Sequence, residues 1–122
     1  HRDLHSFPTR RSSDLEAAIL SKMADRGQLK GCIVDGPFAL DNAISKKSCE
    51  VKGIRSEVGG DADILLMPDI EAANVMYKTI AYLTDYKMAG IIVGAEVPII
   101  LTSRADSDVT KYLSILAGVS LV

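Results

Sequence analysis

The chain has 122 residues, of which 48% are hydrophobic and 25% are charged, and its formal net charge at pH 7 is −2. A mildly acidic chain of this kind lacks the electrostatic footprint of a nucleic-acid-binding protein. It also lacks an apolar run of the ~18 residues that would cross a bilayer. We therefore expect neither nucleic acid nor a membrane among its partners.

The first fifteen residues, HRDLHSFPTRRSSDL, differ from the rest of the chain in composition. They are rich in arginine and serine and contain no apolar segment of the kind found in a signal peptide. The stretch resembles the in-frame translation of a common short-read sequencing adapter at every position. We therefore expect residues 1–15 to be a non-native, disordered tail, and the native sequence to begin near Glu16.

Without this tail, the chain offers fewer kinds of chemistry. The tail carries three arginines and two aspartates, so the net charge of residues 16–122 is −3. Both histidines, His1 and His5, also lie in it, which leaves no histidine for a catalytic triad or a zinc site, and we expect no metal. The sparse cysteines, Cys32 and Cys49, favour free thiols in a reducing cytoplasm over a disulfide framework.

The first half of residues 16–122 predicts two helices around one buried strand. Apolar spacing indicates helices over 16–25 and 38–44. Residues 31–34 are apolar throughout, as in a strand covered on both faces of a parallel sheet, so Cys32 is expected to be buried. The polar stretch 45–60 is predicted to be a long connection, of the length typical of a functional or partner-facing loop.

The second half predicts three strands and two helices. A buried strand over 63–67 precedes Asp69, which is a natural N-cap for a helix running to about Leu83. Strands over 89–93 and 97–101 are joined by too few residues for a parallel crossover, so we expect them to be antiparallel. A helix over 108–121 closes the chain.

Polar residues gather where the last strand meets the last helix. Ser103, Arg104, Asp106 and Asp108 follow the aliphatic run that ends at Leu101. Ligands of α/β proteins collect beyond the carboxyl ends of strands, and a helix N-terminus attracts anions, so Arg104 is well placed for a phosphate. Ser103 and Asp106, three residues apart, also fit a capping box, and the sequence leaves both interpretations open.

Five segments carry a resemblance to a known family. They resemble the carboxyl-terminal part of phosphate butyryltransferases, which belong with phosphate acetyltransferases in one phosphate acyltransferase family. Their order and spacing are those of the family from Glu16 to about Leu116. The segments are residues 20–27 (LSKMADRG), 31–37 (GCIVDGP), 62–68 (ADILLMP), 71–78 (EAANVMYK) and 101–107 (LTSRADS).

The resemblance implies a fold and a reaction. The fold is α/β, a three-layer sandwich with a mostly parallel sheet, and the chain is the carboxyl-terminal part of a two-domain protein. Residues 16–96 would belong to the second domain, and residues 97–122 would return to the first. The reaction is acyl exchange between butyryl-CoA and phosphate in a cytoplasmic homodimer, with coenzyme A as a substrate and no tightly bound cofactor.

The resemblance also implies site residues. Ser103 matches a residue that assists the oxyanion, and Arg104 matches a phosphate ligand. Acetyl-transferring relatives carry an aspartate where this chain has Thr110. Asp106, Asp108 or a residue from the missing half of the site would replace it as the base, and of the residues present we take Asp106 as catalytic. Substrate-binding roles are implied for Asn74 and Lys78 on the 70–83 helix, and for Asp35, Gly36 and Pro37 after the first strand.

Other functions remain open at this point. The chain could be a phosphate acetyltransferase, or the acyltransferase-like domain of a fusion with an enoyl-CoA hydratase module. A non-catalytic dimerising subunit is a further alternative, which the retained Ser103 and Arg104 disfavour. The isolated chain is expected to be inactive, because the resemblance assigns the other wall of the cleft to sequence that it does not contain.

Overall fold

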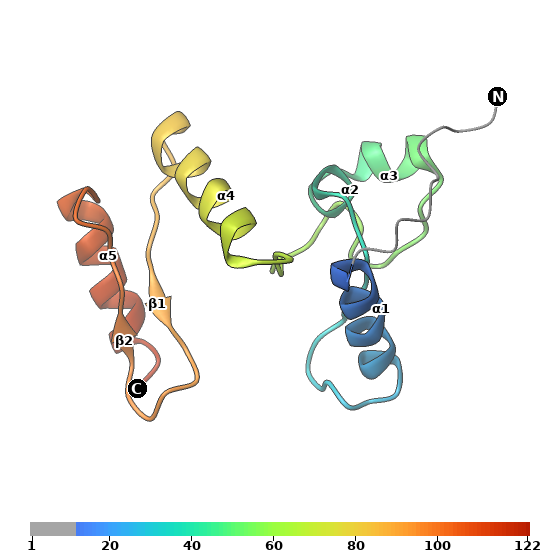
Figure 1. Cartoon of the computed structure of the whole chain (residues 1–122), viewed down its shortest axis with the longest axis horizontal. Helices are drawn as coiled ribbons and strands as arrows, with labels where there is room; N and C mark the ends of the chain where they lie inside the picture. The colour runs from blue at the N-terminus through green and yellow to red at the C-terminus, as the bar shows by residue number, and fades with distance from the viewer. Residues whose placement is uncertain (1–11) are drawn as a thin grey trace. The chain divides into compact units, whose positions relative to one another are not determined.

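A computed structural model describes residues 12–122. The chain divides into two compact units, one up to Pro68 and one over Asp69–Val122. The first unit holds three helices, and the second holds two helices and a pair of short strands (Figure 1). Within residues 12–122, no helix combines the length and the apolar character needed to cross a membrane.

The helices of the first unit differ from the predicted ones at two places. Helix α1 spans Ser12–Asp25, so it includes the last four residues of the predicted tail, whereas residues 1–11 lie outside the described residues. Helix α2 is Leu40–Ile44. Helix α3, Lys46–Lys52, lies inside the predicted connection 45–60, and the prediction of an unbroken loop there was wrong.

Both ends of α3 are closed by specific residues. The hydroxyl of Ser45 accepts a hydrogen bond from the Ser48 N–H at 3.2 Å, which is an N-cap. Gly53 ends the helix with φ 66°, in the left-handed conformation that glycine adopts without a Cβ clash. The sequence did not predict this helix, because seven residues are too few for a clear apolar period and the segment is rich in charged residues.

The small core of the first unit lies between α2 and α3. Asn42, Ala43 and Cys49 are buried there, and the Cys49 thiol donates to the Asn42 carbonyl at 3.0 Å. The chain after α3 returns to the same place, where the Gly60 N–H donates to the Asn42 carbonyl at 2.8 Å. Polar backbone groups of α2 therefore hold the end of the loop.

The two strands predicted in the first unit do not form within the described chain. Residues 31–34 and 63–67 have no strand partner there, and Cys32 is exposed rather than buried. Ile64 is 84% exposed and Leu66 78% exposed. A strand needs a neighbour to receive its backbone hydrogen bonds, and residues 12–122 supply none for these segments. The mostly parallel sheet is therefore not present in this part of the chain.

The second unit agrees more closely with the predicted elements. Helix α4 is Ile70–Leu83, and the Asp69 carboxylate caps it by accepting from the Ala72 N–H at 2.7 Å. Strands β1 (Ile91–Ile92) and β2 (Ile99–Ile100) pair in antiparallel fashion, as the short link between them predicts. The predicted N-cap and strand direction are both confirmed.

Helix α5, Asp108–Val119, packs along the β1 and β2 pair (Figure 1). Small residues make this approach possible. Ser114 is 0% exposed, and a Cβ placed on the buried Gly118 would lie 3.2 Å from Cγ1 of Ile100. The strand pair and α5 therefore form one packed group, and residues 101–107 connect β2 to α5 within it.

Candidate active site

Residues 103–106 form a turn between β2 and α5, which we call the Ser103–Asp106 turn. Its two ends are joined twice: the Asp106 N–H donates to the Ser103 carbonyl at 3.1 Å, and the Ser103 N–H donates to Oδ2 of Asp106 at 2.6 Å. Arg104 and Ala105 occupy the tip. The turn is therefore closed by two hydrogen bonds, and Arg104 lies at its tip.

The capping interpretation of Ser103 was wrong. Helix α5 begins at Asp108, and its N-cap is Ser107, whose hydroxyl accepts from the Thr110 N–H at 3.2 Å. Asp108 lies in the first turn of that helix, where a carboxylate interacts favourably with the positive end of the helix dipole. Ser103 is left outside the helix, so its hydroxyl has no capping task.

Ser103 and Arg104 can both donate hydrogen bonds to an anion. The Ser103 hydroxyl accepts a long bond from the Ala105 N–H at 3.4 Å, which leaves its own proton for another acceptor. Arg104 is exposed, and among residues 12–122 its guanidinium has no ion pair. An exposed guanidinium and a hydroxyl with a proton to donate, at adjacent positions of one turn, suit a tetrahedral anion.

Tyr77 connects this turn to helix α4. Its hydroxyl donates to Oδ2 of Asp106 at 3.1 Å, across 29 positions of sequence. Partial burial raises the pKa of the Tyr77 phenol above 10.0, and the hydrogen bond to Asp106 and the charge of that carboxylate raise it further. Tyr77 therefore remains a donor at neutral pH.

Asn74 and Lys78 lie one helical turn apart and line a common pocket on α4, with a volume of about 380 Å³. Tyr82, from the next turn of the helix, lines it too. The Lys78 ammonium is 5.0 Å from the centre of the Tyr77 ring and 5.6 Å from that of Tyr82, which are cation–π distances. The structure thus brings the two predicted α4 residues together.

The remaining predicted residues belong to the first unit. Asp35, Gly36 and Pro37 follow the extended segment 31–34, and the Gly36 N–H donates to Oδ1 of Asp35 at 2.8 Å. The bond between Gly36 and Pro37 is cis. These residues lie in an irregular segment of their own unit.

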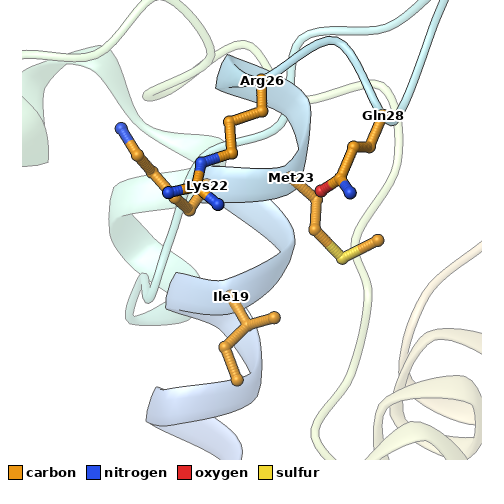
Figure 2. A pocket seen from close by; sticks show the side chains of 5 residues that line it. All are labelled: Ile19, Lys22, Met23, Arg26 and Gln28. Atoms are coloured by element: carbon orange, nitrogen blue, oxygen red, sulfur yellow. The ribbon is translucent and has the colours of Figure 1, made fainter.

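Another pocket lies in the first unit, and none of the predicted site residues lines it. It has a volume of about 240 Å³ and lies along the carboxyl-terminal half of α1 (Figure 2). Lys22 at its rim is paired with Asp25 at 3.1 Å. The other side chains that line it are Ile19, Met23, Arg26 and Gln28.

The site residues of the second unit lie on the framework of a known family. Residues 6–117 match the family described as phosphate acetyl/butaryl transferase, and the chain belongs to that family. It is 61% identical over 101 residues to a phosphate acetyltransferase of Thermotoga maritima, covering 83% of this chain and 34% of the relative. It is also 61% identical over 103 residues to a phosphate butyryltransferase of Clostridium acetobutylicum, covering 84% and 34%.

A solved structure extends the comparison. The chain is similar to a branched-chain phosphotransacylase from Enterococcus faecalis V583, with a TM-score of 0.77 and 34% identity. The match covers 89% of this chain and 39% of that one. The chain thus spans about a third of the length of the curated relatives that it matches, and the mixed helix and strand content agrees with an α/β class.

Proposed function

We propose that this chain is part of a phosphate acyltransferase, which exchanges a short acyl group between coenzyme A and inorganic phosphate. The observation that carries the proposal is that one closed turn presents the exposed Arg104 next in sequence to Ser103. Relatives with equal identity are named as acetyl and butyryl transferases, so the proposal includes both acyl groups. The family membership supports it.

In this mechanism Arg104 binds phosphate and Ser103 stabilises the carbonyl oxygen of the thioester. A planar guanidinium holds two phosphate oxygens and leaves another to attack the thioester carbonyl. That attack places negative charge on the carbonyl oxygen, where the Ser103 O–H donates a hydrogen bond. Collapse of the tetrahedral intermediate breaks the C–S bond and releases coenzyme A as the thiolate, which takes up a proton.

Further parts of the proposal concern the whole protein. Asn74 and Lys78 would contact coenzyme A or phosphate from the pocket on α4, and Asp35, Gly36 and Pro37 would line the substrate cleft. Residues 31–34 and 63–67 would become strands of a parallel sheet within a three-layer, two-domain fold, divided at residue 96. The protein would act as a cytoplasmic homodimer without a tightly bound cofactor.

A hybrid enzyme tests the proposal. The matched segment of this chain replaces the corresponding third of the Clostridium acetobutylicum phosphate butyryltransferase, and we refer to this protein as the hybrid. Coenzyme A release is measured with a thiol reagent while phosphate is varied, with butyryl-CoA and acetyl-CoA compared. We expect phosphate-dependent release, and the ratio of kcat/KM values for the two acyl donors, compared with that of the unchanged relative, shows how this segment alters the acyl preference.

Substitutions at two positions of the hybrid separate the assigned roles. Arg104→Lys keeps the charge but loses the two-pronged donor, so about 2 to 3 kcal/mol of charge-assisted hydrogen bonding is lost. This corresponds to about a 30- to 150-fold fall in kcat/KM for phosphate, and Arg104→Ala should cost more. Ser103→Ala should lower kcat by about 100-fold. An Arg104→Ala hybrid within about threefold of its parent would overturn the assignment.

A non-catalytic dimerising subunit would behave differently in the hybrid, whereas a fusion with an enoyl-CoA hydratase module would not. The fusion would retain the same turn and the same dependence on Arg104. A non-catalytic subunit would leave the hybrid without turnover, although the hybrid would fold and bind its partner copy. The thiol assay and the oligomeric state of the hybrid therefore identify a non-catalytic subunit, whereas the gene sequence upstream of this segment would identify a fusion.

A further inference from the structure

Tyr77 joins the two groups of residues that the proposed function uses. Its hydroxyl contacts Asp106 in the Ser103–Asp106 turn, and its ring lies beside the Lys78 ammonium. Helix α4 runs unbroken from Ile70 to Leu83, so Tyr77 projects from a rigid element. The residue therefore links a helix to the turn that presents Arg104.

The Ser103–Asp106 turn has few other attachments. Among the hydrogen bonds of residues 103–106 within the described chain, the one from Tyr77 alone originates outside the turn. Bonds within the turn hold its shape but do not hold it against the rest of the unit. A displacement of about 1 Å at a reacting group can cost about 100-fold in rate, so an external anchor matters to this turn.

We propose that Tyr77 is a positioning residue, which holds the Ser103–Asp106 turn against α4 through Asp106 so that Ser103 and Arg104 face the reacting groups. This inference rests on the proposed function and deepens it. Asp106 then acts through its hydrogen bonds and not as the general base. Its Oδ2 accepts from both the Ser103 N–H and the Tyr77 hydroxyl, so that oxygen is engaged on two sides.

The two roles of Asp106 predict different substitution patterns. Asp106→Asn keeps one carbonyl oxygen that can accept both hydrogen bonds, but it cannot accept a proton from a thiol. Asp106→Ala removes both functions. A positioning role predicts that asparagine is tolerated and alanine is not, whereas a base role predicts a comparable loss for both.

The first experiment uses the 122-residue chain and needs no activity. Amide hydrogen exchange of Ser103 is measured by NMR in the parent, in Tyr77→Phe and in the two Asp106 variants. We expect Tyr77→Phe to speed exchange at Ser103 by about fivefold and Asp106→Ala by about 30-fold, with Asp106→Asn close to the parent. Exchange at the Gly90 amide, which is bonded to Ser114, serves as the internal control for general loosening.

The second experiment measures kinetics in the hybrid. Tyr77→Phe should lower kcat/KM for phosphate by about 10-fold, because it removes one hydrogen bond to a charged group. Asp106→Asn should stay within about fivefold of the parent, and Asp106→Ala should lose about 100-fold. Tyr86→Phe, at an exposed tyrosine, is the matched control and should leave kinetics unchanged.

The outcomes separate this inference from the proposed function. If Arg104→Ala abolishes activity while Tyr77→Phe changes neither kcat/KM nor Ser103 exchange, the positioning role is overturned and the proposed function stands. If Asp106→Asn loses as much activity as Asp106→Ala, Asp106 is the base and the inference fails. If the exchange pattern appears while Arg104→Ala keeps full activity, the proposed function fails instead.

Discussion

The hydroxyl of Ser114 accepts a hydrogen bond from the Gly90 N–H at 2.9 Å and donates one to the Thr110 carbonyl at 2.7 Å. Ser114 is fully buried on α5, and Gly90 lies just before β1. The serine therefore joins the helix to the strand pair by a polar contact inside the packed face. This bond and the packing of Gly118 against Ile100 together hold α5 on the strand pair.

Ser114→Ala should destabilise the chain. The substitution leaves the Gly90 N–H without its partner, and an unsatisfied donor away from water costs about 1 to 3 kcal/mol. Urea unfolding of the chain measures the loss, and amide exchange locates it at Gly90. Ser120→Ala, at an exposed serine of the C-cap, is the control and should change stability little. Equal stability of the two variants would contradict the importance of the buried bond.

Gly60→Ala should cost more stability than Gly27→Ala. Both glycines have positive φ, 77° and 71°, so each alanine variant bears the same backbone strain of about 1 kcal/mol. A Cβ at Gly60 would also lie 2.2 Å from the Lys46 N, whereas a Cβ at Gly27 meets nothing within 4 Å. The difference between the melting temperatures of the two variants measures the cost of the steric clash at Gly60. Similar melting temperatures would show that the chain after α3 is not held against that helix.

The Asp41 carboxyl should titrate below its ordinary range. The hydrogen bond from Lys52 at 2.6 Å lowers its pKa first, and a hydrogen bond from Ser48 lowers it further. Between the lowered pKa and 3.8, the unfolded chain binds a proton that the native chain does not. The stabilising contribution is therefore present above this window and is lost as pH falls through it.

Carboxyl NMR titration of the chain checks this prediction. Lys52→Met should raise the Asp41 pKa toward 3.8, whereas Lys47→Met, which removes a neighbouring lysine, should not. Because both side chains of the Lys52–Asp41 pair are close to half exposed, we expect a modest effect on stability. An unchanged titration in Lys52→Met would mean that the pair does not form in solution.

Tyr77 gives the opposite dependence at high pH. Its raised pKa means that, just above pH 10, an unfolded Tyr77 has lost its proton while the native one keeps it. The unfolded state then binds fewer protons, so stability falls as pH rises from 10 through the native pKa. Unfolding measured across that range should show the fall in the parent and a smaller one in Tyr77→Phe. Parallel curves would mean that the Tyr77–Asp106 hydrogen bond does not form in solution.

The chain by itself should show no phosphate-dependent release of coenzyme A. It spans about a third of its relatives' length, and Arg104 is exposed on its turn. Catalysis requires groups that hold both reactants in place. The thiol assay used for the hybrid applies directly, with the hybrid as the positive control. Sustained release by the purified chain would show that residues 12–122 hold a complete site.

Short-range signals were reliable in the second unit. The Asp69 cap and the period of residues 70–83 predicted α4 because both depend on contacts within one turn of helix. The brief link at residues 94–96 required an antiparallel pair, since the chain had no length to cross over. Helix α3 was missed because its caps, Ser45 and Gly53, lie in a charged stretch without an apolar period.

By itself, the sequence determined the local elements of the second unit. It also placed Ser103 and Arg104 together, since they are neighbours in the chain. Tertiary structure alone decided which atoms Asp106 meets, because Tyr77 lies 29 positions away. It also decided that residues 31–34 and 63–67 remain unpaired within residues 12–122. An apolar run indicates that a segment is stabilised by burial, but a strand forms only where another backbone lies beside it to exchange hydrogen bonds.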